Sequence, residues 1–157
     1  MDIQSEEGRP SPCRCPGCGA TLGPHLLLPS VSVPCPDCGY TVWCCSRRVE
    51  EVLVLDVLPD RTPEQGDIER LADSLAGSCD VPRIIVELSQ LDRINSLLLA
   101  KLIVLNRCIQ RARGKLVLCG LQELVRETFV STKLDTLFEI VEDEETALDG
   151  LLSGNPA

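Results

Sequence analysis

A short cysteine motif occurs twice in the N-terminal third of the chain. The pattern Cys-Pro-x-Cys-Gly stands at residues 15–19 and again at residues 35–39. In each copy, two thiolates three positions apart can converge on one ion, the Pro stiffens the turn, and the final Gly permits a positive φ. Two such turns supply the four sulfur ligands of a closed, tetrahedral, structural zinc site. We therefore predict that one Zn²⁺ is bound by Cys15, Cys18, Cys35 and Cys38.

Other possible metal ligands lie close to these motifs. Cys13 competes with Cys15, but only Cys15 reproduces the repeated pattern. We expect Cys44 and Cys45 to be strand residues and His25 to be a loop or strand residue, because four cysteines already fill a tetrahedral shell. The sequence leaves open whether Cys13, Cys44 or Cys45 contributes to metal binding.

Residues 11–48 resemble the zinc ribbon family, in which two such turns cap a few short strands. The resemblance implies strands at residues 26–28 and 40–43. A ribbon of this size buries too little surface to fold alone, so metal binding would supply its folding free energy. We expect residues 1–10 to form a flexible N-terminus.

Composition and charge limit the compartment and the partners. The chain has 10 cysteines, but its acidic N-terminus does not resemble a secretory signal, and no apolar stretch reaches the roughly 20 residues of a membrane helix. We therefore expect a cytoplasmic protein in which closely spaced cysteines bind metal and disulfides are rare. The net charge is −9, and residues 51–157 hold 11 basic and 19 acidic side chains, a net of −8. Since such a surface repels phosphate backbones and anionic lipids, we expect neither nucleic acid nor membrane as a partner.

The second region, residues 49–153, alternates apolar runs with amphipathic segments. Apolar, β-branched runs indicate strands at residues 52–58, 84–88, 116–119 and 137–141, and helical spacing of apolar residues indicates helices at residues 63–76, 97–111, 122–130 and 144–152. This order predicts an α/β domain with a parallel or mixed sheet covered by helices. Residues 47–50 leave almost no linker to the ribbon, so the two domains should dock closely.

The second region lacks the usual signatures of catalysis. It has no Gly-rich phosphate loop, no Gly-x-Ser-x-Gly and no His to act as a base. Carboxylates such as Asp56 and Asp60 are present, but nothing in the sequence orients them as acid and base. Cys79, Cys108 and Cys119 are widely spaced and are interpreted as small buried hydrophobes. We expect a protein that is not an enzyme.

One polar segment, residues 92–96, lies between a predicted strand and a predicted helix. Asn95 or Ser96 suits the N-cap of that helix, and local sequence alone favours this structural role. A phosphate on Ser96 would lie at the positive end of the helix dipole, next to backbone N–H groups that have no partner within the helix.

Residues 51 to about 152 resemble the STAS domain, the fold of bacterial anti-sigma factor antagonists. The resemblance rests on residues 84–96, with Leu91 and Asn95-Ser96, on residues 113–121, on residues 134–138 and on Glu-Glu-x-Ala-Leu at residues 144–148. In the family, this helix opens with Asp-Ser-(Ser/Thr)-Gly-Leu-Gly. An anti-sigma factor serine kinase phosphorylates the first Ser, which matches Ser96, while the Asp matches Asn95. Unphosphorylated antagonist binds the kinase and frees the sigma factor, and phosphorylated antagonist lets go.

The chain departs from this family motif at several positions. Asn95 replaces Asp, Leu97 replaces Ser or Thr, and Leu98 and Ala100 stand where Gly is usual, so Leu98 would block a partner or offer it an apolar contact. The leading hypothesis is an anti-sigma factor antagonist-like signalling protein, with Ser96 phosphorylated and the partner bound by Asn95, Ser96, Leu97 and Leu98. The alternatives are a STAS scaffold or sensor without phosphorylation, including a stressosome-like assembly, and a transcription-associated zinc-ribbon protein.

Overall fold

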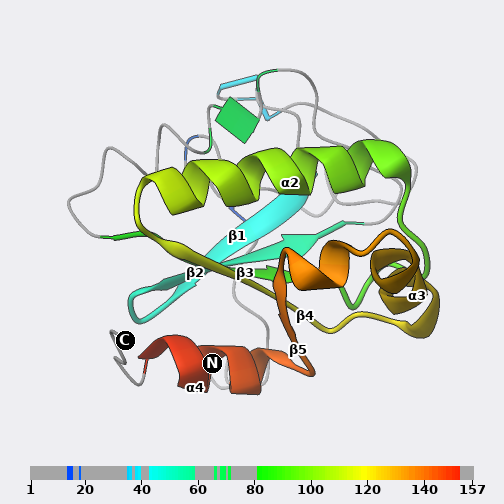
Figure 1. The fold of residues 1–157 in the computed structure, drawn as a ribbon. Coiled ribbons are helices and arrows are strands. Elements are labelled where there is room, and N and C mark those ends of the chain that lie inside the picture. Colours follow the sequence, from blue (N-terminus) through cyan, green and yellow to red (C-terminus); the bar gives the residue numbers. More distant parts are fainter. Residues whose placement is uncertain are drawn as a thin grey trace, which may run out of the picture.

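A five-stranded mixed β-sheet forms the centre of the molecule (Figure 1). The structure is a computed structural model that describes Arg14, Cys15, Cys18, Cys35, Pro36, Cys38, Gly39, Gly66, Ile68, Glu69, Leu71 and residues 43–58 and 81–152. Across the sheet the strands follow chain order: β1 (Cys44–Val49), β2 (Val52–Val57), β3 (Arg83–Glu87), β4 (Lys115–Cys119) and β5 (Glu139–Val141). The helical elements are α2 (Ser96–Arg111), α3 (Glu123–Ser131), the 3₁₀ turn η3 (Leu134–Thr136) and α4 (Glu144–Leu152).

Strands β1 and β2 form an antiparallel hairpin, and the other neighbouring strands pair in parallel. The hairpin turn consists of Glu50 and Glu51, and Glu50 adopts a positive φ of 56°. Parallel pairs require crossover connections. Helix α2 connects β3 to β4, and α3 with η3 connects β4 to β5. The mixed sheet covered by helices is the fold class that the sequence predicts.

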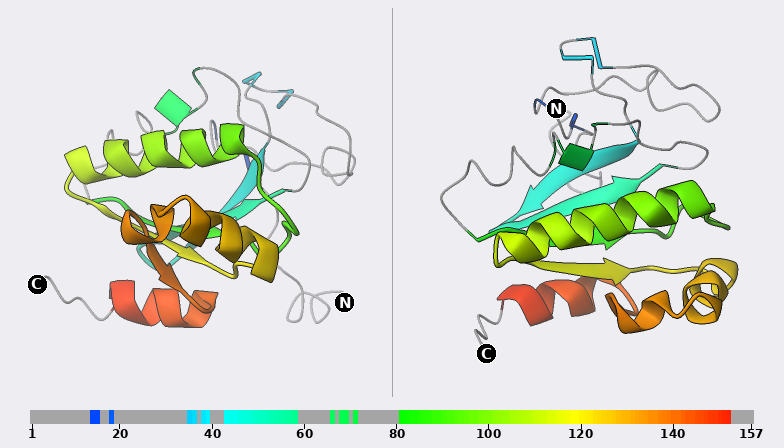
Figure 2. Two further views of the ribbon diagram at one scale, coloured as in Figure 1. Left: turned by 45° about the vertical axis from the view of Figure 1, so that its right-hand side comes forward. Right: turned by 45° about the horizontal axis from the view of Figure 1, so that its top comes forward.

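Helices cover both faces of the sheet, with α2 over one face and α4 over the other (Figures 1 and 2). The side chains of β2 alternate between two clusters of buried residues. Val52 and Val54 pack on the side of α4, with Leu151, whereas Leu55 and Val57 pack on the side of α2. Burial on both faces explains why β2 is a nearly continuous apolar run rather than an alternating one.

Most predicted elements of the second region are found within one residue of their predicted ends. They are the strands predicted at residues 52–58, 84–88 and 116–119 and the helices predicted at residues 97–111, 122–130 and 144–152. Most of the helix predicted at residues 63–76 lies outside the described residues. Ile68, Glu69 and Leu71 are helical, and Ile68 and Leu71 are buried as its apolar face requires.

The strand predicted at residues 137–141 is wrong at its start, because β5 begins only at Glu139. The 3₁₀ turn precedes it: Lys133 has a left-handed φ of 63°, and the Phe138 N–H donates to the Leu134 carbonyl at 3.1 Å. This turn brings Phe138 into the core, where its ring and that of Phe129 form an edge-to-face pair with the centroids 5.7 Å apart. Packing of one aromatic ring therefore overrides the local strand pattern.

The start of the sheet also differs from the prediction. Trp43 lies outside any strand, and residues 26–28 and 40–42 lie outside the described residues. Cys44 and Cys45 are strand residues, as predicted. Residues 47–49, expected at the junction of two domains, belong to β1, because their pairing with β2 continues to the hairpin turn. Strand β1 thus crosses the expected boundary between residues 48 and 49, and the division into domains stays a prediction.

The remaining cysteines are placed in different ways. Cys45 is disulfide-bonded, and the expectation that disulfides are rare in the chain stays a prediction. A disulfide needs two Cβ atoms about 3.5–4.5 Å apart, and the fold rather than sequence spacing decides which cysteines meet. Cys119 is fully buried and Cys108 partly buried, while Cys79 lies outside the described residues.

Among the residues that the structure describes, no helix combines the length and apolar character needed to cross a membrane.

Candidate functional site

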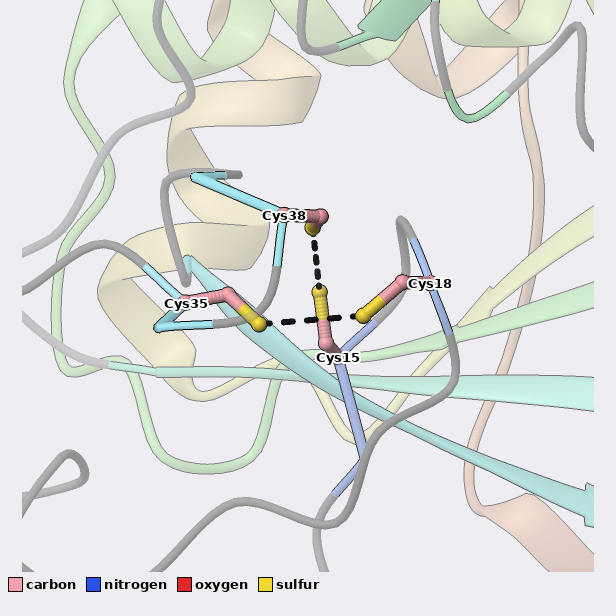
Figure 3. Close-up of side chains that lie close together, drawn as sticks. All are labelled: Cys15, Cys18, Cys35 and Cys38. Carbon is pink, nitrogen blue, oxygen red and sulfur yellow. Dashed lines mark hydrogen bonds between the residues drawn. The ribbon is translucent and has the colours of Figure 1, made fainter.

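The four motif cysteines lie together, although the two motifs begin 20 residues apart in the sequence. Their Sγ atoms all fall within 4.8 Å of one another and point toward a common centre (Figure 3). The Sγ atoms of Cys15 and Cys38 are 3.6 Å apart, and those of Cys18 and Cys35 are 3.7 Å apart. Each close pair joins the first motif to the second, so the two motifs form one cluster, hereafter the cysteine cluster.

The sulfur spacing fits a tetrahedral metal site. Zn–S bonds of about 2.3 Å at tetrahedral angles place neighbouring sulfurs about 3.8 Å apart. The Cys15–Cys38 and Cys18–Cys35 sulfur distances, 3.6 and 3.7 Å, lie close to that value. Within the described part of the chain, no other group of three or more potential ligands converges in this way. Four thiolates leave no position open for substrate, which is typical of structural rather than catalytic zinc.

The cluster has a buried side and an open side. Cys15 and Cys35 are only 1% and 2% exposed, Cys38 is half-buried and Cys18 is exposed. In the second motif the Gly39 N–H donates to the Cys35 carbonyl at 2.8 Å, and Gly39 adopts a φ of 76°, as the motif predicts. Cys44 and Cys45 are not members of the cluster. Cys13 and His25 lie outside the described residues.

Sequence reasoning missed an ion-pair network near the hairpin. Arg47 on β1 donates from Nε to Asp56 Oδ2 at 2.7 Å and from Nη1 to Glu144 Oε2 at 2.8 Å. The hydrogen bond to Glu144, followed by that to Asp56, raises the pKa of Arg47 above its ordinary value. The network fastens the start of α4 to the β1–β2 hairpin. The sequence does contain a signal for the Arg47–Asp56 pair, because the two residues lie on either side of the hairpin turn. That signal can be used only once residues 44–49 are recognised as a strand.

Helix α2 begins with Asn95 as its N-cap. Asn95 has an extended backbone with φ −96° and ψ 166°, and its Oδ1 accepts a hydrogen bond of 2.7 Å from the backbone N–H of Leu98. Of the two caps that the sequence allowed, the structure uses Asn95, and Ser96 is the first helical residue. An Asp would accept the same bond. Asn95 therefore keeps the local geometry of the family's Asp without its charge.

The loop before α2 is held at several points. Leu91 is 5% exposed, and its N–H donates to the Leu88 carbonyl at 3.0 Å. The N–H and hydroxyl of Ser89 donate to Glu87 Oε1 at 3.0 and 2.6 Å, and the Ser89 carbonyl accepts a bond of 2.8 Å from Gln122 Nε2. These contacts fix the loop from β3 and from the start of α3, so the first turn of α2 has a defined position.

The side chains at the start of α2 divide between surface and core. Asn95 and Ser96 are exposed, and Leu97 is 55% exposed. Leu98 is 3% exposed and packs in the core on the α2 side of the sheet. The side chain of Leu98 therefore neither blocks a partner nor offers it an apolar contact. The partner-binding role expected of Leu98 stays a prediction.

Cys119, at the end of β4, has the properties of an unreactive thiol. Burial, with a further contribution from Glu87 and more distant carboxylates, raises the pKa of the Cys119 thiol to about 12. The thiolate is the nucleophile and the metal ligand. Cys119 is therefore a small buried hydrophobe, as its wide spacing from the other cysteines indicates.

Comparison with protein families identifies the fold. The STAS domain family matches residues 45–147, which is more than half of the chain. The chain therefore belongs to the STAS domain family. The matched residues run from β1 into α4 and include Asn95 and Ser96.

Solved structures share this fold at low sequence identity. A candidate anti-sigma factor antagonist from Thermotoga maritima has a TM-score of 0.61 and 19% identity, covering 69% of this chain and 94% of its own. An anti-sigma factor antagonist from Mycobacterium paratuberculosis has a TM-score of 0.57 and 17% identity, covering 76% and 99%. A chain of the stressosome, a signal integration and transduction hub, has a TM-score of 0.56 and 19% identity, covering 69% and 96%. No curated protein matches the chain.

Proposed function

We propose that this protein is a non-enzymatic, cytoplasmic signalling protein that binds an anti-sigma factor serine kinase, and that the kinase phosphorylates Ser96. One observation carries the proposal. Ser96, which corresponds to the Ser that the kinase modifies in the family, is exposed at the first position of α2. The loop before it is held by the bond from Gln122 to Ser89 and by the burial of Leu91. A kinase would thus meet an accessible hydroxyl in a defined position.

The physical effect of phosphorylation follows from charge. A phosphate on Ser96 adds a charge of about −1.5 to −2 next to the exposed Leu97. The helix dipole stabilises that charge at the start of α2, so the domain itself tolerates it. A partner that buries Leu97 must desolvate the phosphate, and an acidic partner surface would repel it. The unphosphorylated form binds the kinase, and the phosphorylated form is released.

The test uses the full chain, a cognate anti-sigma factor kinase and labelled ATP. We expect one phosphate per chain, lost in Ser96→Ala and retained in Ser131→Ala. Ser131 is a matched control because it is also exposed and lies at the end of α3. Label that persists in Ser96→Ala would contradict the assignment. So would kinase binding that Ser96→Asp leaves unchanged.

A second candidate function is a scaffold that acts without phosphorylation. Two observations favour it: Leu97 and Ala100 depart from the family motif on exposed positions of α2, and a stressosome chain shares the fold. This candidate predicts a large assembly in solution, whereas the antagonist predicts a small species that binds a kinase. Measuring the mass of the purified protein by light scattering distinguishes the two.

A structural zinc ion in the cysteine cluster forms part of the proposal. It is supported by the convergence of the four Sγ atoms within 4.8 Å and by a donor set of thiolates alone. With its ligands complete, the ion would stabilise the fold and take no part in a reaction. Native mass spectrometry should find one zinc ion per chain. Nucleic acid is not a partner in this proposal, and binding in a gel-shift experiment at low salt would contradict that part.

A further inference from the structure

The buried side of the cysteine cluster belongs to the core of the STAS domain. Cys15 and Cys35 pack in the same cluster of buried residues as Leu55 of β2 and Leu105 of α2. Trp43, directly before β1, is fully buried in this cluster too. The Trp43 carbonyl accepts a hydrogen bond of 3.0 Å from the N–H of Leu58, the residue directly after β2. Cys15 and Cys35, the first ligand of each motif, are therefore part of the apolar core that covers the sheet.

The chain next to the cluster is also paired with the sheet. Arg14, immediately before Cys15, forms an antiparallel bridge with Ser46 in the middle of β1. The Arg14 carbonyl accepts hydrogen bonds from the Ser46 N–H at 3.0 Å and from the Ser46 hydroxyl at 3.3 Å. Ser46 is 8% exposed. Among the strands that the structure describes, β1 lies at the edge of the sheet, so Arg14 covers part of that edge.

The residue after Ser46 carries the connection to the opposite face of the sheet. Arg47 holds Asp56 of β2 and Glu144 at the start of α4. The contacts therefore run from Cys15 through the Arg14–Ser46 bridge to Arg47, and from there to α4. Each step is an adjacent residue or a hydrogen bond.

We infer that the cysteine cluster is a metal-dependent brace of the STAS sheet rather than an independent module. A bound ion holds Arg14 and Cys15 against β1, and β1 in turn positions Arg47 for β2 and α4. This inference rests on the proposed zinc site. Binding to the native state alone stabilises that state. Since the bound segment is paired with β1, the stabilisation reaches the sheet. The signalling domain is thereby sensitive to the supply of metal.

The chain contains a built-in reporter for the test. Trp43 is the only Trp, and it is buried in the same core cluster as Cys15 and Cys35. The experiment measures Trp fluorescence and hydrogen exchange of the full chain with one zinc ion bound and after removal of zinc by a chelator. We expect Trp43 emission to move to longer wavelength. We also expect amide exchange in β1 to accelerate by about tenfold or more, with smaller acceleration in α2.

Three variants test metal binding, a thiol outside the cluster and the Arg47 link separately. Cys18→Ser removes the exposed ligand with little loss of core packing and should reproduce the effect of the chelator. Cys108→Ser changes a partly buried thiol of α2 outside the cluster and should leave both signals as they are. Arg47→Met should make exchange in α4 insensitive to zinc, while β1 keeps its sensitivity.

The outcomes decide between the two proposals. If zinc binds but its removal accelerates exchange only before Trp43, the brace is wrong and the zinc site stands. If no zinc binds, the zinc site and the brace are both wrong, while phosphorylation of Ser96 is untouched. If the chelated chain unfolds completely, titrating zinc back into the parent chain must restore Trp43 burial and β1 protection together. Recovery of one without the other contradicts the brace.

Discussion

The cysteine cluster and the start of α2 are built in opposite ways. The cluster joins two segments about twenty residues apart, and two of its four side chains are almost completely buried in the core. The start of α2 is local: Asn95 caps the helix, and Ser96 and Leu97 face solvent beside it. A site of the first kind is tied to stability, whereas a site of the second kind can change its charge without unfolding the domain. The two regions are therefore suited to holding the fold and to switching, respectively.

The largest effect should come from a buried ligand of the cluster. Cys35→Ser removes one thiolate, and we expect the loss of tight zinc binding and of several kcal/mol of stability. Structural zinc sites supply about 10–16 kcal/mol in small metal-dependent domains, so even a fraction of that value exceeds the effects expected at Arg47, Asn95 and Ser96. Urea unfolding in zinc-buffered solution measures the change. Cys108→Ser is the control.

The opposite result would break the comparison. If Cys35→Ser and the parent chain have equal stability in zinc-buffered solution, the cluster does not hold the fold. A decrease that is the same with zinc and with chelator would instead assign the effect to lost packing of a buried side chain.

The second prediction concerns the link between the hairpin and α4. Arg47→Met leaves Asp56 and Glu144 without their shared partner. Removing one member of a buried ion pair costs about 3–5 kcal/mol. Because Arg47 is 23% exposed, we expect about 1–3 kcal/mol. Arg83→Met is a matched control on β3, because the partner of Arg83, Glu51, is 72% exposed and such surface pairs contribute about 0–1 kcal/mol. Equal losses in the two variants would show that the Arg47 network does not fasten α4.

The sequence predicts those parts of the molecule whose signals are local. The repeated cysteine motif predicts which four cysteines come together, because turn chemistry and ligand spacing lie within five residues. The apolar runs of β2 and β3 and the periodicity of α2 predict the sheet and its covering, because burial on both faces leaves a continuous pattern. In these cases the residues that determine the local structure lie within the same short segment of sequence.

The parts that sequence reasoning missed depend on distant partners. Residues 47–49 resemble a junction in the sequence because two adjacent arginines are not typical of a strand, yet Asp56 and Glu144 neutralise Arg47 there. Phe138 leaves the predicted strand because its ring packs edge-to-face with that of Phe129, nine residues earlier. The bridge from Arg14 to Ser46 spans 32 residues. Apart from the Arg47–Asp56 pair within one hairpin, none of these contacts has a signature within its own segment.

The third prediction tests the cap at the start of α2. Asn95→Ala removes the acceptor for the Leu98 N–H and should cost about 1 kcal/mol, since loss of an N-cap typically costs about 0.5–2 kcal/mol. Asn95→Asp keeps an acceptor and adds a charge at the positive end of the helix, so its stability should equal or slightly exceed that of the parent chain. Urea unfolding measures both variants. A loss in Asn95→Asp as large as in Asn95→Ala would contradict the capping role.

The smallest effect on stability should come from Ser96, the residue with the largest proposed effect on function. Ser96→Asp places a negative charge at an exposed position in the first turn of α2, so we expect the free energy of unfolding to change by no more than about 0.5 kcal/mol. Kinase binding should fall strongly in the same variant, because the charge lies beside Leu97 on the proposed contact surface. Urea unfolding and a binding titration on one preparation measure the two quantities. A loss of stability that accounts for the loss of binding would mean that the start of α2, like the cysteine cluster, holds the fold, and the contrast between the two regions would disappear.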